Sequence, residues 1–463
     1  MAGKKIGKEA IVIGAGMAGL AAAGALADYF ERVIVLERDS LPNQAAPRSG
    51  TAQSRHLHAL LPGGQRALTD LFPHFERDLV IAGAVPLRML GDLRVEIPGL
   101  GPVPPRNFGW LFYSASRPLI ESITRRQAER LANLTVRSEC RVHEITATPD
   151  GSMVTGVRYE CADGRQEILA ADFVVDASGR GAPTLALLRS SDQPVPDEIV
   201  IGVDLHYTTA TFVVPQDAND NWKGIATHPR APEWRRGGYM LPIEGNRWIL
   251  TLMGQLGERP PAEPNGFMDY ALRLGTQTIY NAIKHAERQG GFERYGYPAS
   301  VWRRFDRLST FPRGLLPIGD SICRFNPIYG QGMSVAAQEA RLLNQLLKDR
   351  ATKADPLAGL APAFFSKAVP LVEAPWSMSA VPDLAYPETR GERSADFESR
   401  LEYNRALMRT AMRDAAVHRL LAEVQQLLKP PSVLQDPAVN RLVQSELFQM
   451  APNNLNRTPR GYL

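Results

Sequence analysis

Three glycines with a fixed spacing follow an apolar strand close to the N-terminus. The segment 14–19 reads Gly-Ala-Gly-Met-Ala-Gly and comes directly after the apolar run 10–13. Gly14 permits a tight turn, Gly16 lets the backbone approach a pyrophosphate, and Gly19 lets the next helix pack close to a sheet. This spacing is typical of a turn that binds the phosphates of a dinucleotide.

The elements around this turn complete a dinucleotide-binding unit. A small, apolar helix is predicted over 18–27, and its first-turn amides, with Met17 and Ala18, would face the phosphates. A second strand is predicted over 32–36. It ends at Glu37, the acid expected about twenty positions after the glycines to accept hydrogen bonds from a ribose. Arg38 follows it and is assigned to the same site.

A second glycine-bearing segment begins about 300 residues further along the chain. A core strand is predicted over 315–318, and Gly319 and Asp320 follow it. A carboxylate at the end of such a strand can hold a ribityl hydroxyl, or sugar and phosphate oxygens, of a flavin nucleotide. Asp320 is therefore a candidate ligand of the cofactor, with Gly319 beside it.

The turn after this strand suits the close approach of a flat ring. Its pattern is Pro-x-x-Gly-x-Gly, and its candidate site residues are Pro327, Gly330, Gln331, Gly332 and Met333. Glycines let backbone amides approach a ring with no side chain between. A helix is predicted over 333–347, and its N-terminus favours the negative charge that a reduced flavin develops. With the N-terminal glycines, this turn indicates the two ends of one site for non-covalently bound FAD.

Two further loops are assigned to the same site. The strand predicted over 173–176 ends at Asp176 and continues into a glycine turn whose Arg180 would supply charge near the pyrophosphate. The plainer interpretation is an ordinary strand-to-loop turn. In the loop 48–58, Arg48 and Gln53 are expected to contact cofactor or substrate.

Histidine and arginine side chains near these loops leave alternatives open. His56 and His58 have a spacing that could suit a metal, but no carboxylate or cysteine cluster nearby completes a site, so no metal is expected. Arg117 opens a helix predicted over 117–131, where it could clamp a phosphate or ribose. The alternative for Arg117 is a surface ion pair.

Composition narrows the class of protein. The 463 residues suit two or three intertwined domains, and the formal net charge of +4 comes from interspersed charges of both signs. No basic run with interleaved aromatics appears, so no nucleic-acid partner is expected. The 3 cysteines form no CxxC pair, which indicates neither a disulfide framework nor a zinc site and favours the cytoplasm. No apolar run is long enough to predict a membrane span.

The order of predicted elements divides the chain into three parts. A discontinuous FAD-binding domain is expected over 1–75, 109–190 and 300–348. A substrate-binding domain is expected over 76–108, which is rich in Pro and Gly, and over 191–299, where strand patterns dominate. Segments 134–136, 141–145, 155–160 and 167–170 are predicted to form a small antiparallel hairpin set. Residues 349–463 are predicted to form a helical cap.

These motifs resemble the para-hydroxybenzoate-hydroxylase-like superfamily of flavoprotein monooxygenases over most of residues 8–345. The loop 48–58, Ser116-Arg117, the turn 176–181 and the segment 319–333 look most like bacterial flavin epoxidases of polyether biosynthesis, a branch similar to squalene epoxidase. The resemblance implies an α/β fold: a Rossmann-like FAD-binding domain of the GR2 type with a mixed or parallel sheet, an inserted β-sheet substrate domain and a C-terminal helical cap.

The resemblance also implies roles for individual residues. The glycines at 14, 16 and 19 would bind the ADP pyrophosphate, Glu37 the adenosine ribose, Arg117 the cofactor's linker and Asp320 its ribityl–pyrophosphate part. Pro327, Gly330 and Gly332 would shape the pocket where oxygen reacts with the flavin. Ala182 and Gln331 depart from the pattern of relatives, and the C-terminal third is its least diagnostic part, so substrate specificity is not carried over.

The implied reaction is oxygenation of a small organic substrate. NAD(P)H, bound transiently, or a separate flavin reductase would reduce FAD, and O2 would then give a flavin hydroperoxide that transfers one oxygen atom. An apolar, polyketide- or terpenoid-like substrate is expected. Epoxidation is favoured over aromatic hydroxylation because no base for deprotonating a phenol stands out in the sequence.

Three other classes of flavoprotein remain as alternatives. A prenyl reductase would hydrogenate an alkene on the same fold, and a non-catalytic protein would only bind the flavin. A flavin-dependent halogenase would usually show a Trp-x-Trp-x-Ile-Pro segment, and none of the 6 tryptophans lies in that context. The sequence therefore predicts an oxygenase before these three.

Overall fold

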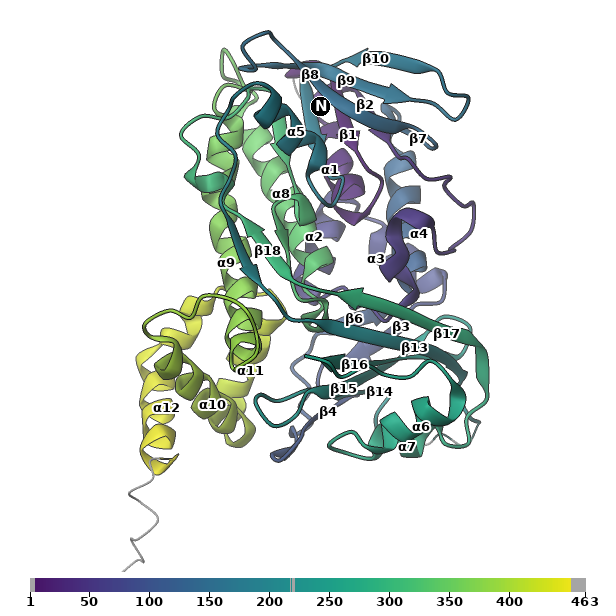
Figure 1. Cartoon of the computed structure of the whole chain (residues 1–463), viewed down its shortest axis with the longest axis vertical. Coiled ribbons are helices and arrows are strands. Elements are labelled where there is room, and N and C mark those ends of the chain that lie inside the picture. The colour runs from purple at the N-terminus through teal and green to yellow at the C-terminus, as the bar shows by residue number, and fades with distance from the viewer. Residues whose placement is uncertain (1–4, 217, 219–220, 451–463) are drawn as a thin grey trace, which may run out of the picture.

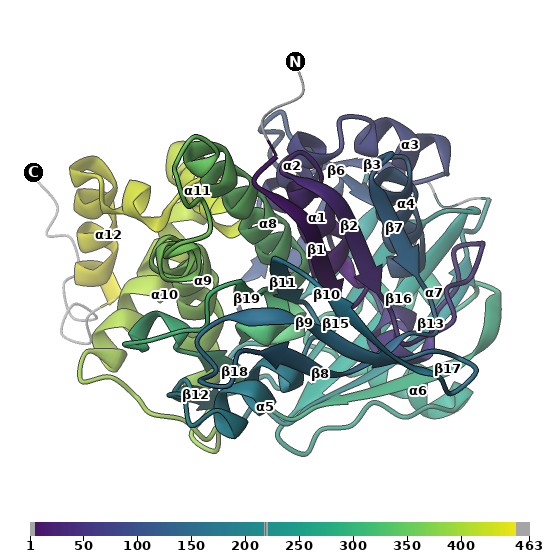
Figure 2. The same cartoon turned by 90° about the horizontal axis from the view of Figure 1, so that it is seen from above.

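A computed structural model describes residues 5–216, 218 and 221–450. Figure 1 shows a five-stranded sheet with helices α1 and α8 in the upper part, a seven-stranded sheet below it, and the C-terminal helices in yellow to one side. Figure 2 shows the same layers from above, with the helices α8 and α9 lying between the first sheet and the C-terminal helices. The structure therefore has the predicted α/β class.

The five-stranded sheet is parallel and has the order β19-β11-β1-β2-β7. Its strands are Leu315–Pro317, Phe173–Asp176, Gly7–Ile13, Phe30–Leu36 and Leu134–Arg137. Successive side chains alternate between two faces. Val12 and Val35 pack with helix α1 (Met17–Ala27). Ile11 and Ile34 pack on the opposite face, against residues of the antiparallel sheet that contains Ile145 and Val157. The sheet is buried on both faces, as its unbroken apolar runs predict.

The prediction for segment 134–136 was wrong. It joins the five-stranded sheet as β7, parallel to β2, rather than the antiparallel set. The segment follows helix α4 (Arg117–Glu129), which packs against α1, so the chain returns to the sheet through a helical crossover and enters it parallel. The predicted antiparallel set consists of β8 (Arg141–Ala147), β9 (Val154–Glu160) and β10 (Gln166–Ala170).

The seven-stranded sheet has the order β17-β13-β16-β15-β14-β4-β5. Its long strands are β13 (Leu205–Val213), β15 (Arg236–Ile243), β16 (Arg247–Gln255) and β17 (Arg288–Tyr297). The shorter ones are β14 (Gly224–Thr227), β4 (Leu93–Ile97) and β5 (Gly101–Pro102), so the segments 76–108 and 191–299 share one sheet. Helices α6 (Pro264–Leu272) and α7 (Thr278–Ile283) bury one of its faces, and the other lines the cavity described below.

Smaller elements connect these sheets. The helices are α2 (Pro62–Leu71), α3 (Phe75–Ile81) and α5 (Ala182–Ser190), and the strands are β3 (Val85–Arg88), β6 (Leu111–Ser114), β12 (Glu198–Ile201), β18 (Ser300–Arg303) and β20 (Cys323–Arg324). β12, β18 and β20 form their own antiparallel sheet, and β3 pairs with β6. The main hydrophobic core runs from α1 through α8 to α9.

The C-terminal part is helical over its described residues, as predicted, and residues 451–463 of that prediction lie outside the described residues. Its helices are α8 (Gly332–Arg350), α9 (Leu360–Leu384), α10 (Phe397–Arg413), α11 (Ala415–Gln425) and α12 (Pro437–Met450). α9 packs along α8, and α10 to α12 enclose a small core of their own. Within the described ranges, no helix is both long enough and apolar enough to cross a membrane.

Candidate functional site

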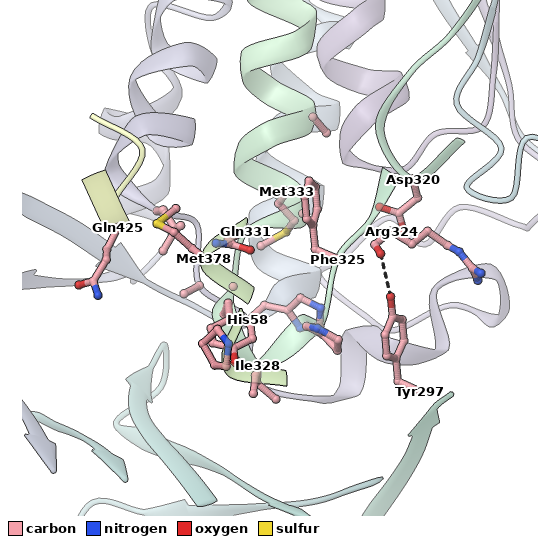
Figure 3. Close-up of a pocket in the computed structure, with 18 of the residues that line it drawn as sticks. His58, Tyr297, Asp320, Arg324, Phe325, Ile328, Gln331, Met333, Met378 and Gln425 are labelled. Atoms are coloured by element: carbon pink, nitrogen blue, oxygen red, sulfur yellow. Dashed lines mark hydrogen bonds between the residues drawn. The ribbon is translucent and has the colours of Figure 1, made fainter. Parts of the chain in front are cut away.

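A cavity of about 2530 Å³ lies where the five-stranded sheet, the seven-stranded sheet and the C-terminal helices meet. Its wall includes residues from the turn after β1, the turn before α8, strands β13 to β17, and helices α9 to α11. Figure 3 shows part of it, with Asp320 and Arg324 at one side, Gln331 and Met333 in the middle, and Met378 and Gln425 at the other side. Segments far apart in the sequence therefore face one space.

The N-terminus of α1 opens onto this cavity. Gly14 has φ of +98°, which favours glycine, and it makes the turn between β1 and the helix. Gly16 is the N-cap residue, the first helical turn carries no acidic side chain, and no side chain caps it. A Cβ added at Gly16 would meet nothing within 4 Å, so the backbone here is free to approach a ligand. A helix N-terminus of this kind attracts anions.

Gly19 has a packing role, as its position in the motif predicts. A Cβ added there would lie 1.9 Å from the carbonyl oxygen of Gly14. Any larger residue would push the helix away from the turn. Gly19 itself does not line the cavity.

The N-terminus of α8 opens onto the same cavity. Gly330, with φ of +66°, ends the short 3-10 helix Pro327–Tyr329, and α8 begins at Gly332. The first turn of α8 also lacks acidic residues, and a Cβ added at Gly332 would meet only the Asp320 carboxylate, at 3.8 Å. Oε1 of Gln331 is buried without a hydrogen-bond partner in the described structure. Two helix N-termini thus face one cavity, and a buried acceptor without a described partner lies at one of them.

Asp320 points into the cavity near arginines. Its side chain is open to the cavity although protein surrounds it, and this enclosure raises the pKa of Asp320 to about 6. Nearby guanidinium groups, first that of Arg324, act in the opposite direction. Figure 3 shows Asp320 and Arg324 side by side, with the Tyr297 hydroxyl donating to the Arg324 carbonyl oxygen at 3.1 Å. A carboxylate in this place is available to a bound hydroxyl group.

A buried ion-pair network forms another wall. Nη1 of Arg48 lies 2.8 Å from Asp39 and 3.2 Å from Glu37, and its Nε donates to Glu121 at 2.7 Å. Arg117 pairs with Glu121 at 2.8 Å and is 5% exposed, so its ion pair is internal rather than on the surface. Arg48, Arg117, Glu37 and Arg38 all line the cavity.

Glu37 holds the glycine turn as well as facing the cavity. Its Oε2 accepts from the amide of Ala15 at 2.7 Å, and its Oε1 accepts from the amide of Asp39 at 3.0 Å. These bonds fix the carboxylate at the end of β2. A ribose would therefore have to use lone pairs that the two amides leave free.

Asp176 and Gly319 do not line the cavity. Asp176 is fully buried, and its carboxylate accepts from the amide of Ser178 and from the amide and hydroxyl of Thr184. Asp176 therefore holds the loop that carries Arg180 at the cavity. This arrangement does not support the predicted direct contact between Asp176 and the cofactor. Gly319, with φ of +65°, donates its amide to the buried Glu339 at 2.6 Å. The other predicted site residues line the cavity: Gly14, Gly16, Met17, Ala18, Glu37, Arg38, Arg48, Arg117, Asp320, Pro327, Gly330, Gln331, Gly332 and Met333.

A buried triad that the sequence analysis missed supports the turn before α8. Asp383, on α9, accepts from Nδ2 of Asn326 at 3.0 Å with both carboxylate oxygens, and from the Tyr329 hydroxyl at 3.2 Å. Oδ1 of Asn326 in turn accepts from the amide of Ile328 at 3.2 Å and so caps the 3-10 helix. Burial raises the pKa of Asp383 to about 7. No local sequence pattern marks Asp383, because its partners lie more than 50 positions away.

Histidines and hydroxyl groups line the side of the cavity that faces the seven-stranded sheet. Nδ1 of His56 lies 2.7 Å from the hydroxyl of Thr209, and Nδ1 of His228 lies 2.7 Å from the hydroxyl of Tyr239. Burial lowers the pKa of His56, His58 and His228 to about 4. These imidazoles are therefore neutral at pH 7 and are weak bases. Among the described residues, no group of three or more His, Cys, Asp or Glu side chains is arranged to hold a metal.

The comparisons with known proteins identify relatives in sequence and in fold. No protein-family profile matches the chain. Protein Rv3254 of Mycobacterium tuberculosis is 32% identical over 402 residues, which cover 83% of this chain and 82% of that protein. Its name states no activity.

Solved structures share the fold at low sequence identity. The flavin-dependent brominase Bmp2 has a TM-score of 0.67 at 14% identity and covers 96% of this chain and 99% of its own. PqsL, a probable FAD-dependent monooxygenase from Pseudomonas aeruginosa, has a TM-score of 0.61 at 17% identity and covers 82% of this chain and 97% of its own. The Diels-Alderase PyrE3 has a TM-score of 0.58 at 16% identity, and the match covers 91% of this chain and 81% of PyrE3.

These neighbours confirm the predicted fold class, although their different reactions show that the fold alone does not define the chemistry. The chain has the fold of the flavin-dependent monooxygenases, and by its likeness to Rv3254 it belongs to the same family as that protein.

Proposed function

We propose that this protein is a FAD-dependent monooxygenase that inserts one oxygen atom from O2 into an apolar, polyketide- or terpenoid-like substrate. One observation carries the proposal: the N-termini of α1 and α8 open onto one cavity through glycine turns, and neither first turn holds an acidic side chain. The N-terminus of α1 suits the pyrophosphate. The N-terminus of α8 suits the part of the flavin ring that becomes negatively charged on reduction.

The residues around the cavity fit FAD. Gly14, Gly16 and the first-turn amides of α1 would bind the pyrophosphate, Glu37 the adenosine ribose, and Asp320 the ribityl chain. The turn before α8, which includes Gln331, would hold the ring. When bound, FAD supplies two-electron redox chemistry and the activation of O2. Arg48 and Arg117 already form ion pairs with carboxylates. They would therefore position the cofactor rather than neutralise its phosphate charge.

The substrate side favours epoxidation over hydroxylation of a phenol. An alkene needs no deprotonation, whereas a phenol needs a base whose pKa lies near the working pH. The imidazoles of His56, His58 and His228 have pKa values of about 4, far below that range. Asp320, whose pKa is raised to about 6, is assigned here to the ribityl chain of the cofactor rather than to the substrate. Tyr239 and His228 form a hydrogen-bonded pair that could bind and orient the hydroxyl group of a phenol. Hydroxylation of a phenol is therefore the alternative to test.

The first experiment measures the cofactor and then the reaction. Purified protein should be yellow, and acid precipitation should release FAD. NAD(P)H, or a flavin reductase with NAD(P)H, should reduce the bound FAD, and reoxidation by O2 should then be followed with a terminal alkene, a phenol and no substrate.

Each outcome assigns one class. Epoxide formation with consumption of O2 supports the proposal, and a hydroxylated phenol supports the alternative. Anaerobic saturation of the alkene would identify a prenyl-type reductase, and bromination in the presence of bromide would identify a halogenase. A protein that binds FAD but never exchanges electrons with NAD(P)H or a reductase would be a non-catalytic flavin-binding protein. A protein that binds no FAD contradicts the proposal.

A further inference from the structure

The cavity extends beyond the region that a flavin would use. Single ligand pockets commonly measure about 300–1,000 Å³, and this cavity measures about 2530 Å³. Its far end is formed by helices of the C-terminal part, and we call this end the C-terminal lobe. Its apolar wall consists of Met378 on α9 and of Leu421 and Val424 on α11. Met378 and Gln331 line the same cavity, so the lobe is continuous with the turn before α8 (Figure 3).

Two arginines at this lobe have no ion-pair partner in the part of the chain that the structure describes. Arg405 and Arg409 line the cavity from α10, one helical turn apart. Arg405 is exposed and Arg409 is half-buried. Among the described residues, no ion pair or side-chain hydrogen bond involves either of them. Arg413, the next arginine along the helix, pairs with Glu446.

Nearby charges do not neutralise this pair. Arg106 adds a further cation next to the lobe, where its guanidinium donates to the carbonyl oxygens of Ala411 and Met412 at the end of α10. The carboxylates that line the cavity from this part of the chain are Glu373 and Asp396. The hydrogen bond from Ser394 lowers the pKa of Asp396, and the nearby charge of Arg400 lowers it further. Glu402, three residues before Arg405 on α10, is exposed, does not line the cavity, and makes no ion pair with either arginine in the described structure. Arg405 and Arg409 therefore keep positive charge beside the apolar wall.

We propose that the C-terminal lobe binds an elongated amphipathic ligand whose anionic end, a carboxylate or a phosphate, is held by Arg405 and Arg409. The apolar body would lie along Met378, Leu421 and Val424, toward the turn before α8. Arginine suits this role because its planar group can donate two parallel hydrogen bonds to either anion. This inference rests on the proposed function, because it takes the ligand to be the substrate of the monooxygenase. It narrows the substrate class to long apolar molecules with a terminal anion.

The test is direct binding to the full-length, FAD-loaded protein, without turnover. The probes are a pyrene-labelled long-chain carboxylic acid, its methyl ester, and the corresponding pyrene-labelled alkyl phosphate. The variants are Arg405→Gln, Arg409→Gln and the double variant. Arg441→Gln is the matched control, because Arg441 on α12 is also exposed and without a described partner but does not line the cavity.

The expected result is a charge-dependent affinity. Wild type should bind the acid or the phosphate more tightly than the ester, and the double variant should lose about tenfold or more of that affinity while the ester is unaffected. The anion that binds more tightly identifies the end group. Equal binding of ester and anions, no binding of any probe, or an equal loss in Arg441→Gln would overturn the inference. FAD content is measured separately, so a colourless protein that still binds the acid would contradict the proposed function alone.

Discussion

Removing the Asp383 carboxylate should loosen the turn that leads into α8. Asp383→Ala deletes the acceptor of three hydrogen bonds, two from the Asn326 amide and one from the Tyr329 hydroxyl. Tyr329 lines the cavity, where water can replace the lost partner. Asn326 is fully buried and cannot reach water, so its donor stays unsatisfied. A buried donor without a partner costs about 1–3 kcal/mol, which is the expected loss in the free energy of unfolding.

The loss should also reach FAD, because the same Asn326 side chain caps the 3-10 helix that precedes Gly330. Urea unfolding of the apo protein measures the stability, and fluorescence titration with FAD measures the affinity. The matched control is Ser379→Ala, since Ser379 is equally buried on α9 but donates only to carbonyl oxygens of its own helix. Unchanged FAD affinity in Asp383→Ala, or an equal loss in Ser379→Ala, would refute the reasoning.

The remaining predictions concern pH and the cofactor contacts. Because burial raises the pKa of Asp383 to about 7, the folded protein binds one more proton than the unfolded chain between pH 4 and 7, so this group's contribution to stability falls as pH rises through that range. Asp383→Asn should therefore gain stability relative to wild type between pH 5 and pH 8, and urea unfolding with no such gain would contradict the assignment. Gly16→Val should abolish FAD binding and leave the apo fold intact, since a Cβ there meets nothing within 4 Å; flavin content and the apo Tm check this. Gly19→Ala should instead lower the apo Tm, because its Cβ would lie 1.9 Å from the Gly14 oxygen, and an unchanged Tm would show that the helix can shift at no cost. Asp320→Ala should weaken FAD binding by about tenfold to a hundredfold without lowering the apo Tm, as expected for loss of one charge-assisted hydrogen bond to a ligand; a destabilised apo variant that gains the full Tm increment from FAD would assign Asp320 to structure.

Much of the backbone geometry around the two glycine turns could be predicted because its information is local. The run from β1 through the glycines to α1 needs only neighbouring residues: a strand, a residue with positive φ, an uncapped helix start, and an acid at the end of the next strand. The same holds for Asp320 and the turn before α8. Such patterns determine backbone geometry directly, so their prediction did not depend on how the rest of the chain packs.

The packing of distant segments decided the rest. Asp176 ends a strand, where a cofactor ligand is expected, but the amide and hydroxyl of Thr184 on the next helix donate to its carboxylate. Segment 134–137 has a strand pattern, but which sheet it joins depends on the helix α4 before it. Asp383, Arg405 and Arg409 carry no motif. Asp383 meets Asn326 and Tyr329 because α9 packs along α8, and Arg405 and Arg409 line the cavity because α10 follows α9 back toward it. A sequence pattern encodes the local path of the backbone, whereas the partners of a buried side chain follow from which surfaces the folded chain brings together.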